Sequence, residues 1–263
     1  MRDRPLLVFF LVAYAFSWAV YFAMILFGLP MPWTILATFG PTLGALVSQW
    51  VTAGNLRAFR FAPTWTGAAV AGIGGSVLII AVYAAGPALA TVPADRIEWS
   101  AFLSLSVYNY STVLAGPLFE EPGWRGFALP RLQARFGPAL ASLVLGVLWA
   151  AWHLPLFLIP TWSSSPVWIY FLIVVGLSVI MTAGANIARF GVLAAILMHA
   201  AFNTAPRFFG GLFANQGPET PLPFELVIGL CGLAAALVLL LATRGRLFAP
   251  NGKVAMADQT PRT

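Results

Sequence analysis

The chain has 263 residues, of which 60% are hydrophobic and only 8% are charged, and its mean hydropathy is +0.87. A soluble domain carries about 25% charged residues, so the composition excludes a water-soluble fold and indicates a polytopic membrane protein. The net charge of +6 does not indicate nucleic-acid binding, because the positive charges lie in short loops between apolar segments, where they report membrane topology.

Apolar segments of membrane-spanning length follow one another along the chain. A spanning helix needs about 20 mainly apolar residues, and about eight windows have this length: 6–28, 33–53, 65–88, 99–119, 138–160, 166–187, 191–213 and 222–243. They lack the two-residue alternation of barrel strands and therefore predict an all-α bundle of about eight transmembrane helices. The first window is too long for a signal-peptide core and is interpreted as a retained span. We expect one transmembrane domain over residues 1–248 and a disordered tail over 249–263.

The basic residues predict the orientation of the chain, because Lys and Arg accumulate in cytoplasmic loops. With the N-terminus inside, the cytoplasmic segments of an eight-span chain hold Arg2, Arg4, Arg57, Arg60, Arg125, Arg131, Arg135, Arg189, Arg244, Arg246, Lys253 and Arg262. The outer loops hold only Arg96 and Arg207. Both termini are therefore expected in the cytoplasm. The preference for Arg over Lys suggests a GC-rich bacterial sequence, and hence a bacterial plasma membrane.

Glu120, Glu121 and Arg125 form the first polar motif, next to the apolar window 99–119. Successive helical residues differ by about 100° in direction, so the two carboxylates cannot face the same way. Glu121 and Arg125 are four residues apart and can form an ion pair on one face. Glu120 is then free for another role, and a poorly hydrated carboxylate can act as a general base. The alternative interpretation is a charged helix end at the membrane interface.

The only two histidines of the chain supply the second and third motifs, Trp149-x-x-x-His153 and His199-x-x-x-Asn203. Four-residue spacing places each pair on one helical face. His199 and Asn203 are two potential donors to an oxyanion. Alternatively, His153 is a core histidine bonded to another helix and Asn203 an interhelical hydrogen-bond partner. Because ionisable groups at membrane depth mark functional sites by default, the three motifs together favour an active site inside the bundle.

The sequence Phe136-Gly137-Pro138 predicts a tight turn between two helical arms. Glu121 precedes Gly137 by 16 residues and His153 follows it by 16. A helical hairpin would place both side chains at the same level, ~24 Å from the turn at 1.5 Å per residue. We therefore expect a site on the cytoplasmic half of the membrane.

The succession Glu-Glu-x-x-x-Arg, Trp-x-x-x-His and His-x-x-x-Asn resembles the CPBP family of intramembrane endopeptidases, the CAAX-processing and bacteriocin-processing (Abi) relatives. The resemblance covers roughly residues 100–205, and Trp149 stands where the family more often has Phe. It implies a glutamate-dependent peptidase in which Glu120 activates water with the help of His153. His199 and Asn203 would form the oxyanion hole, Glu121 and Arg125 an ion pair, and Trp149 would pack against His153.

The expected function is an intramembrane endopeptidase that cleaves near the cytoplasmic face. Its substrate would be a prenylated CAAX-like C-terminus or a membrane-associated peptide, with lipid as its surroundings. No cofactor is expected. A zinc ion held by the two histidines and a carboxylate is the alternative mechanism, although the sequence H-E-x-x-H is absent. Alternative functions are a non-catalytic scaffold or bacteriocin immunity protein and, last, a transporter or proton relay. No pattern indicates an oligomeric state.

Overall fold

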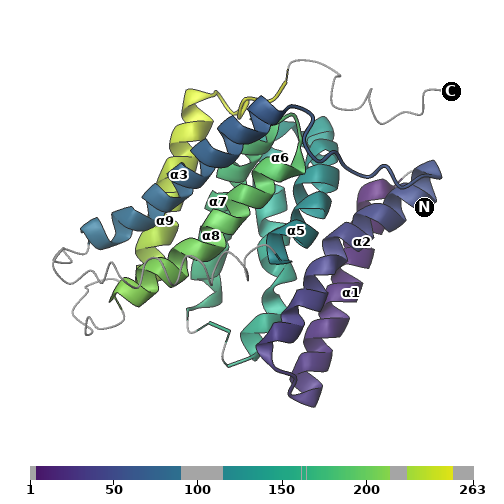
Figure 1. Cartoon of the computed structure of the whole chain (residues 1–263), viewed down its shortest axis with the longest axis horizontal. Helices are drawn as coiled ribbons and strands as arrows, with labels where there is room; N and C mark the ends of the chain where they lie inside the picture. Colours follow the sequence, from purple (N-terminus) through teal and green to yellow (C-terminus); the bar gives the residue numbers. More distant parts are fainter. Residues whose placement is uncertain (1–3, 90–114, 161, 164, 214–223, 251–263) are drawn as a thin grey trace.

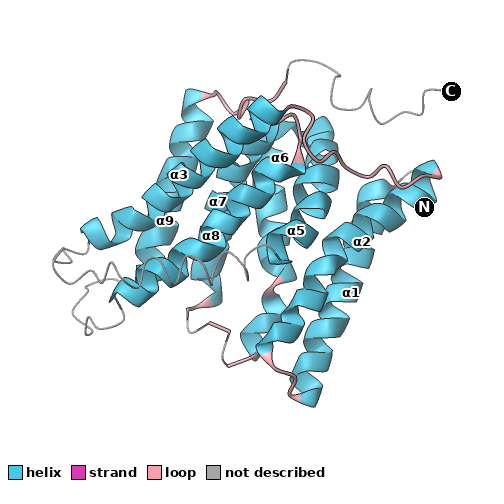
Figure 2. Ribbon diagram, viewed as in Figure 1, coloured by secondary structure: helices cyan, strands magenta, loops and turns pink. Residues whose placement is uncertain are grey.

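The structure is a computed structural model that describes residues 4–89, 115–160, 162–163, 165–213 and 224–250. This part of the chain is built of helices and contains no strand (Figure 2). A single isolated parallel bridge, between Arg60 and Gly191, joins two loops. The prediction of an all-α protein is therefore confirmed.

Six helices follow their predicted windows to within two residues at each end, whereas the window 138–160 matches only part of the helix Leu129–Trp152. The described helices are α1 (Pro5–Phe27), α2 (Thr34–Ala53), α3 (Trp65–Leu89), α5 (Ala115–Glu121), the π-helix η3 (Pro122–Ala128), α6 (Leu129–Trp152), α7 (Val167–Ile187), α8 (Val192–Phe213) and α9 (Phe224–Ala242), with short 3₁₀ turns at Met31–Trp33 and Leu154–Leu158. The window 99–119 lies outside the described residues except for its last five, which open α5, so the count of eight stays a prediction. Five described helical segments are long and apolar enough to cross a membrane.

Glycines terminate the first two helices. Gly28 and Gly54 have φ angles of 62° and 69°, and their N–H groups bind the carbonyls of Met24 and Trp50. This left-handed cap suits glycine because it has no Cβ to clash with the preceding carbonyl. The local sequence thus sets where α1 and α2 end.

The hairpin of α1 and α2 lies on one side of α5 and α6, and α3, α7, α8 and α9 lie on the other (Figure 1). Helices α1 and α2 approach closely, since a Cβ at Gly40 would lie 2.7 Å from the Ala13 carbonyl oxygen and one at Gly44 2.7 Å from that of Phe9. This is the packing that small residues four apart allow between membrane helices.

The arginine-bearing loops lie at one end of the bundle. The N–H groups of Val192 and Leu193 donate to the carbonyls of Arg60 and Phe61, each at 3.0 Å, so the α2–α3 loop meets the turn before α8. Helix α1 begins and α9 ends at this same end (Figure 1). Segments that the charge pattern assigned to one side of the membrane therefore share one end of the structure.

The predicted reversal at Gly137 is present within α6. Gly137 has φ 74° and ψ 168°, a conformation essentially restricted to glycine, and Pro138 starts the second arm. Glu120 and Trp149 are 29 residues apart and would be about 43 Å apart along a continuous helix. Their side chains form a 3.0 Å hydrogen bond, so the two arms lie against each other as a hairpin.

Candidate active site

The π-helix η3 carries Arg125 and presses against two neighbouring segments. A Cβ at Gly123 would lie 2.4 Å from the carbonyl oxygen of Pro41, and one at Gly126 would lie 2.6 Å from Cβ of Phe59. Only glycine permits this approach to α2 and to the α2–α3 loop. The widened turn is also of a kind that occurs frequently at functional sites, and it was not predicted from the sequence.

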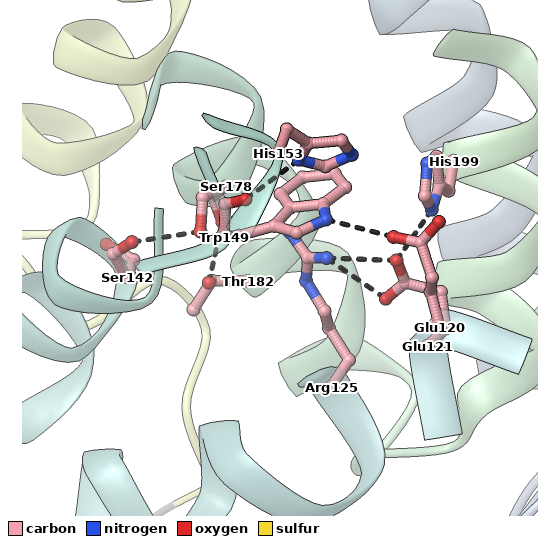
Figure 3. Close-up of polar contacts among 9 residues, drawn as sticks. All are labelled: Glu120, Glu121, Arg125, Ser142, Trp149, His153, Ser178, Thr182 and His199. Carbon is pink, nitrogen blue, oxygen red and sulfur yellow. Dashed lines mark hydrogen bonds and ion pairs between the residues drawn. The ribbon is translucent and has the colours of Figure 1, made fainter. Parts of the chain in front are cut away.

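Glu121 is the centre of a buried charged cluster (Figure 3). Arg125 Nη1 donates to both of its carboxylate oxygens, at 2.9 and 3.2 Å, and His199 Nδ1 lies 2.8 Å from its Oε1. The exposed fractions of Glu121, Arg125 and His199 are 0%, 0% and 3%. The expected pair of Glu121 and Arg125 is present. His199 from α8 also binds Glu121, which was not predicted from the sequence.

Trp149 links the charged cluster to Glu120. Its indole Nε1 donates to Glu120 Oε2 at 3.0 Å, and the Arg125 guanidinium carbon lies 4.1 Å from its ring centroid. Such a cation–π contact stabilises a desolvated guanidinium. The indole also meets the His199 ring edge-on, with 5.0 Å between centroids. Trp149 therefore has a larger part in the site than packing against His153.

Glu120 Oε1 borders a small space that Gly116 leaves open. A Cβ built on Gly116 would lie 3.5 Å from Glu120 Oε1 and 3.9 Å from Asn203 Nδ2. Asn203, from α8, thus flanks the same space as Glu120, from α5. Gly116 was missed in the sequence analysis, although its position four residues before Glu120 places both on one helical face.

His153 lies at the end of α6 among aromatic rings. Its Nδ1 is 2.9 Å from the Trp149 carbonyl oxygen, and ring centroids of Trp152, Tyr170 and Trp162 lie 4.6, 5.4 and 6.2 Å away. The Trp149 ring is 6.2 Å away, which agrees with the expected neighbourhood of the two residues. Packing on several sides fixes the imidazole plane.

The structure gathers side chains from all three motifs into this region. Glu120, Glu121, Arg125, Trp149 and His199 form one hydrogen-bonded set, His153 joins it through the Trp149 backbone, and Asn203 flanks Glu120 across Gly116. Among the described residues, no group of three or more His, Cys, Asp or Glu side chains is arranged to hold a metal ion.

Comparison with known proteins agrees with this arrangement. Residues 96–205 match the family described as type II CAAX prenyl endopeptidase Rce1-like, and this range contains all six candidate site residues. The chain is also 30% identical over 99 residues to a Methanococcus maripaludis protein named CAAX prenyl protease 2. The aligned part covers 35% of this chain and 36% of that relative, about a third of its length. Residues 96–205 are thus similar to the type II CAAX prenyl endopeptidase family, which agrees with the resemblance that the three motifs indicate.

Proposed function

We propose that this protein is a membrane-embedded endopeptidase in which Glu120 activates a water molecule. The observation that carries the proposal is the environment of Glu120, whose Oε2 is occupied by Trp149 Nε1 while its Oε1 borders the space beside Gly116 and Asn203. A water in that space would bind Oε1 and lose its proton to the carboxylate. Glu120 has only 4% of its surface exposed, which suits a base shielded from bulk water.

The hydrogen bond of His153 fixes which of its nitrogens carries the proton. A backbone carbonyl only accepts, so Nδ1 must donate to the Trp149 oxygen. In the neutral imidazole Nε2 then has a free lone pair, which can accept a hydrogen bond from the attacking water. We therefore assign His153 the role of orienting this water. It does not donate a hydrogen bond to the substrate.

The hydrogen bond of His199 leads to a different protonation state. Glu121 already accepts from Arg125 and is ionised, so His199 Nδ1 donates to it. To donate also from Nε2 to an oxyanion, His199 must be the doubly protonated imidazolium. The carboxylate of Glu121 stabilises that positive charge. The role of Glu121 is thus to keep His199 a donor at Nε2.

These assignments give a complete hydrolysis. Glu120 removes a proton from water, and the water oxygen attacks the peptide carbonyl carbon. The oxyanion that forms accepts hydrogen bonds from Asn203 Nδ2 and His199 Nε2, an interaction strongest in the transition state. When the C–N bond breaks, Glu120 returns the proton to the leaving amine. No covalent intermediate is required.

The comparisons support a substrate class. The relative's name describes a protease for CAAX prenyl proteins, and we extend this to lipidated C-terminal peptides or other membrane-associated peptides here. We assign the arginine-bearing end of the bundle to the cytoplasm, in a bacterial plasma membrane, with both termini there and cleavage near that face. The mechanism above uses no metal ion, and a zinc-dependent reaction is the alternative.

The test compares Glu120→Gln and Glu121→Gln with Glu225→Gln, a control on α9 away from the site. Activity is measured on a quenched peptide library in liposomes, and folded protein by size-exclusion chromatography. Glu120→Gln preserves the size of the side chain and is expected to lower kcat about 10²- to 10⁴-fold with the same folded yield. Glu225→Gln is expected to retain activity. Cleavage by Glu120→Gln at the wild-type rate would refute the assignment of the base, and a wild-type protein inactive on every peptide would favour the scaffold alternative.

A further inference from the structure

One face of α1 carries a row of aromatic side chains toward the end of α6. Phe10, Tyr14, Trp18 and Phe22 follow one another at four-residue spacing, and their successive ring centroids are 6.5, 5.4 and 6.3 Å apart. Residues four apart lie on the same helical face. This aromatic row lies outside the family-matched range 96–205, and no step of the proposed reaction uses it.

Two members of the aromatic row form hydrogen bonds to the backbone of α6. The Tyr14 hydroxyl donates to the Leu148 carbonyl, and Trp18 Nε1 donates to the Trp152 carbonyl at 3.0 Å. The acceptors are four residues apart, as are the donors, so the bonds join successive turns of the two helices. Trp152 is the last residue of α6, where a carbonyl has no partner within its own helix.

Each acceptor carbonyl belongs to the peptide unit directly before a residue of the site. The Leu148 carbonyl shares its peptide plane with the Trp149 N–H, and the Trp152 carbonyl shares its plane with the His153 N–H. The His153 N–H itself donates to the Ala150 carbonyl at 3.1 Å. The peptide plane from which His153 extends is therefore held at both ends, on one side by α6 and on the other by α1.

The aromatic row also contacts the other arm of the hairpin. The Phe10 ring lies 6.3 Å from that of Trp124, the residue before Arg125, and Trp124 packs 6.0 Å from Trp152. Both tryptophans are fully buried. One face of α1 thus touches the segment that carries Arg125 and the turn that carries His153.

We infer that Tyr14 and Trp18 are positioning residues that set the orientation of Trp149, which binds Glu120, and of His153. They touch neither Glu120 nor the proposed water, and they act through the two peptide planes. This inference rests on the proposed peptidase function for its effect on catalysis, but its effect on His153 does not depend on activity. Displacements of about 1 Å in a catalytic group can lower a rate about 100-fold, so small changes in these planes have measurable results.

The experiment compares Tyr14→Phe and Trp18→Phe with Ser17→Ala in the full-length protein. Ser17 lies on the same helix and its hydroxyl also donates to a backbone carbonyl, that of Ala37, at 2.7 Å. That bond joins α1 to α2 and not to α6, so Ser17→Ala removes a comparable interaction without touching the site. Thermal unfolding in detergent then shows whether the three variants have the same melting temperature.

Two readouts separate positioning from a general loss of structure. For the best peptide of the wild-type protein, we expect Tyr14→Phe and Trp18→Phe to lower kcat about tenfold with KM nearly unchanged, and Ser17→Ala to lower neither. Because the chain has only two histidines, ¹⁵N-histidine NMR resolves His153 and His199. Trp18→Phe is expected to shift the His153 signals and to leave those of His199 in place.

The inference is overturned if two results occur together. The first is that Tyr14→Phe and Trp18→Phe change kcat no more than Ser17→Ala does, and the second is that the His153 signals do not move. An inactive wild-type protein would refute the proposed function alone. The NMR comparison would then still decide whether α1 orients His153.

Discussion

Replacement of Gly116 by alanine tests the water position more directly than removal of a catalytic group. Gly116 lies in α5, and a methyl group there would be 3.5 Å from Glu120 Oε1, 3.9 Å from Asn203 Nδ2 and 4.0 Å from Thr38 Cγ2. All three are ordinary van der Waals distances, so the methyl fits without moving its neighbours. It would occupy the space in which the proposed mechanism places the attacking water.

The expected effects on stability and activity have opposite signs. Alanine in place of glycine within a helix stabilises the fold by roughly 0.5–1 kcal/mol. A water bound to Glu120 Oε1 has its oxygen about 2.8 Å from that atom, and a methyl carbon 3.5 Å from Oε1 displaces a water that binds on the Gly116 side. Without that water the general base has no proton to remove, and the contribution of general-base catalysis, about 10²- to 10⁴-fold, is lost.

The control is Gly74→Ala in α3, where an added Cβ would meet no atom within 4 Å. It gives a similar gain in helix propensity away from the site. Cleavage rates and thermal unfolding are measured for both variants in the same liposome and detergent preparations. Gly116→Ala is expected to melt no lower than the wild type and to cleave at least about 100-fold more slowly, whereas Gly74→Ala retains full activity. A Gly116→Ala protein with wild-type kcat would show that the water binds elsewhere.

Three further outcomes are expected. Glu121→Gln should lower the melting temperature more than Arg125→Met, because it leaves two buried donors, Arg125 and His199, without their carboxylate. A broken buried pair costs about 3–5 kcal/mol. Equal melting temperatures, or a larger loss in Arg125→Met, would contradict the shared role of Glu121. Gly137→Ala should cost about 1–3 kcal/mol from backbone strain alone, since its Cβ meets no atom within 4 Å; unchanged thermal unfolding would argue against the φ of 74°. Purified protein should retain activity in a chelator, and stoichiometric zinc with chelator-sensitive cleavage would replace the metal-free mechanism.

Helix positions could be predicted from the sequence because apolar length and glycine caps are local properties. The first window, 6–28, corresponds to Pro5–Phe27, and its end is set by the left-handed conformation of Gly28. The pair of Glu121 and Arg125 was equally accessible, since four-residue spacing on a helix brings two side chains together. The turn at Gly137 followed from the same local chemistry of glycine before proline.

The contacts between helices could not be predicted in this way. His199 and Glu121 are separated by 78 residues and Trp149 and Glu120 by 29, and which faces of two helices meet depends on the packing of the whole bundle. The π-helix was missed for a related reason. Its widened turn is fitted to Pro41 and Phe59, which contact the positions of Gly123 and Gly126, and no feature within residues 122–128 predicted those partners.

The C-terminal segment completes a series of hydrogen bonds that begins at Gln133 in α6. Gln133 Nε2 donates to Asn186 Oδ1 at 2.9 Å, and Asn186 Nδ2 donates to the Leu247 carbonyl at 2.8 Å. Leu247 follows α9 and is fully buried. During synthesis, Asn186 therefore receives its last partner only after every helix up to α9 has left the ribosome. A nascent protein stalled before residue 247 lacks the carbonyl that accepts the Asn186 amide in the folded structure.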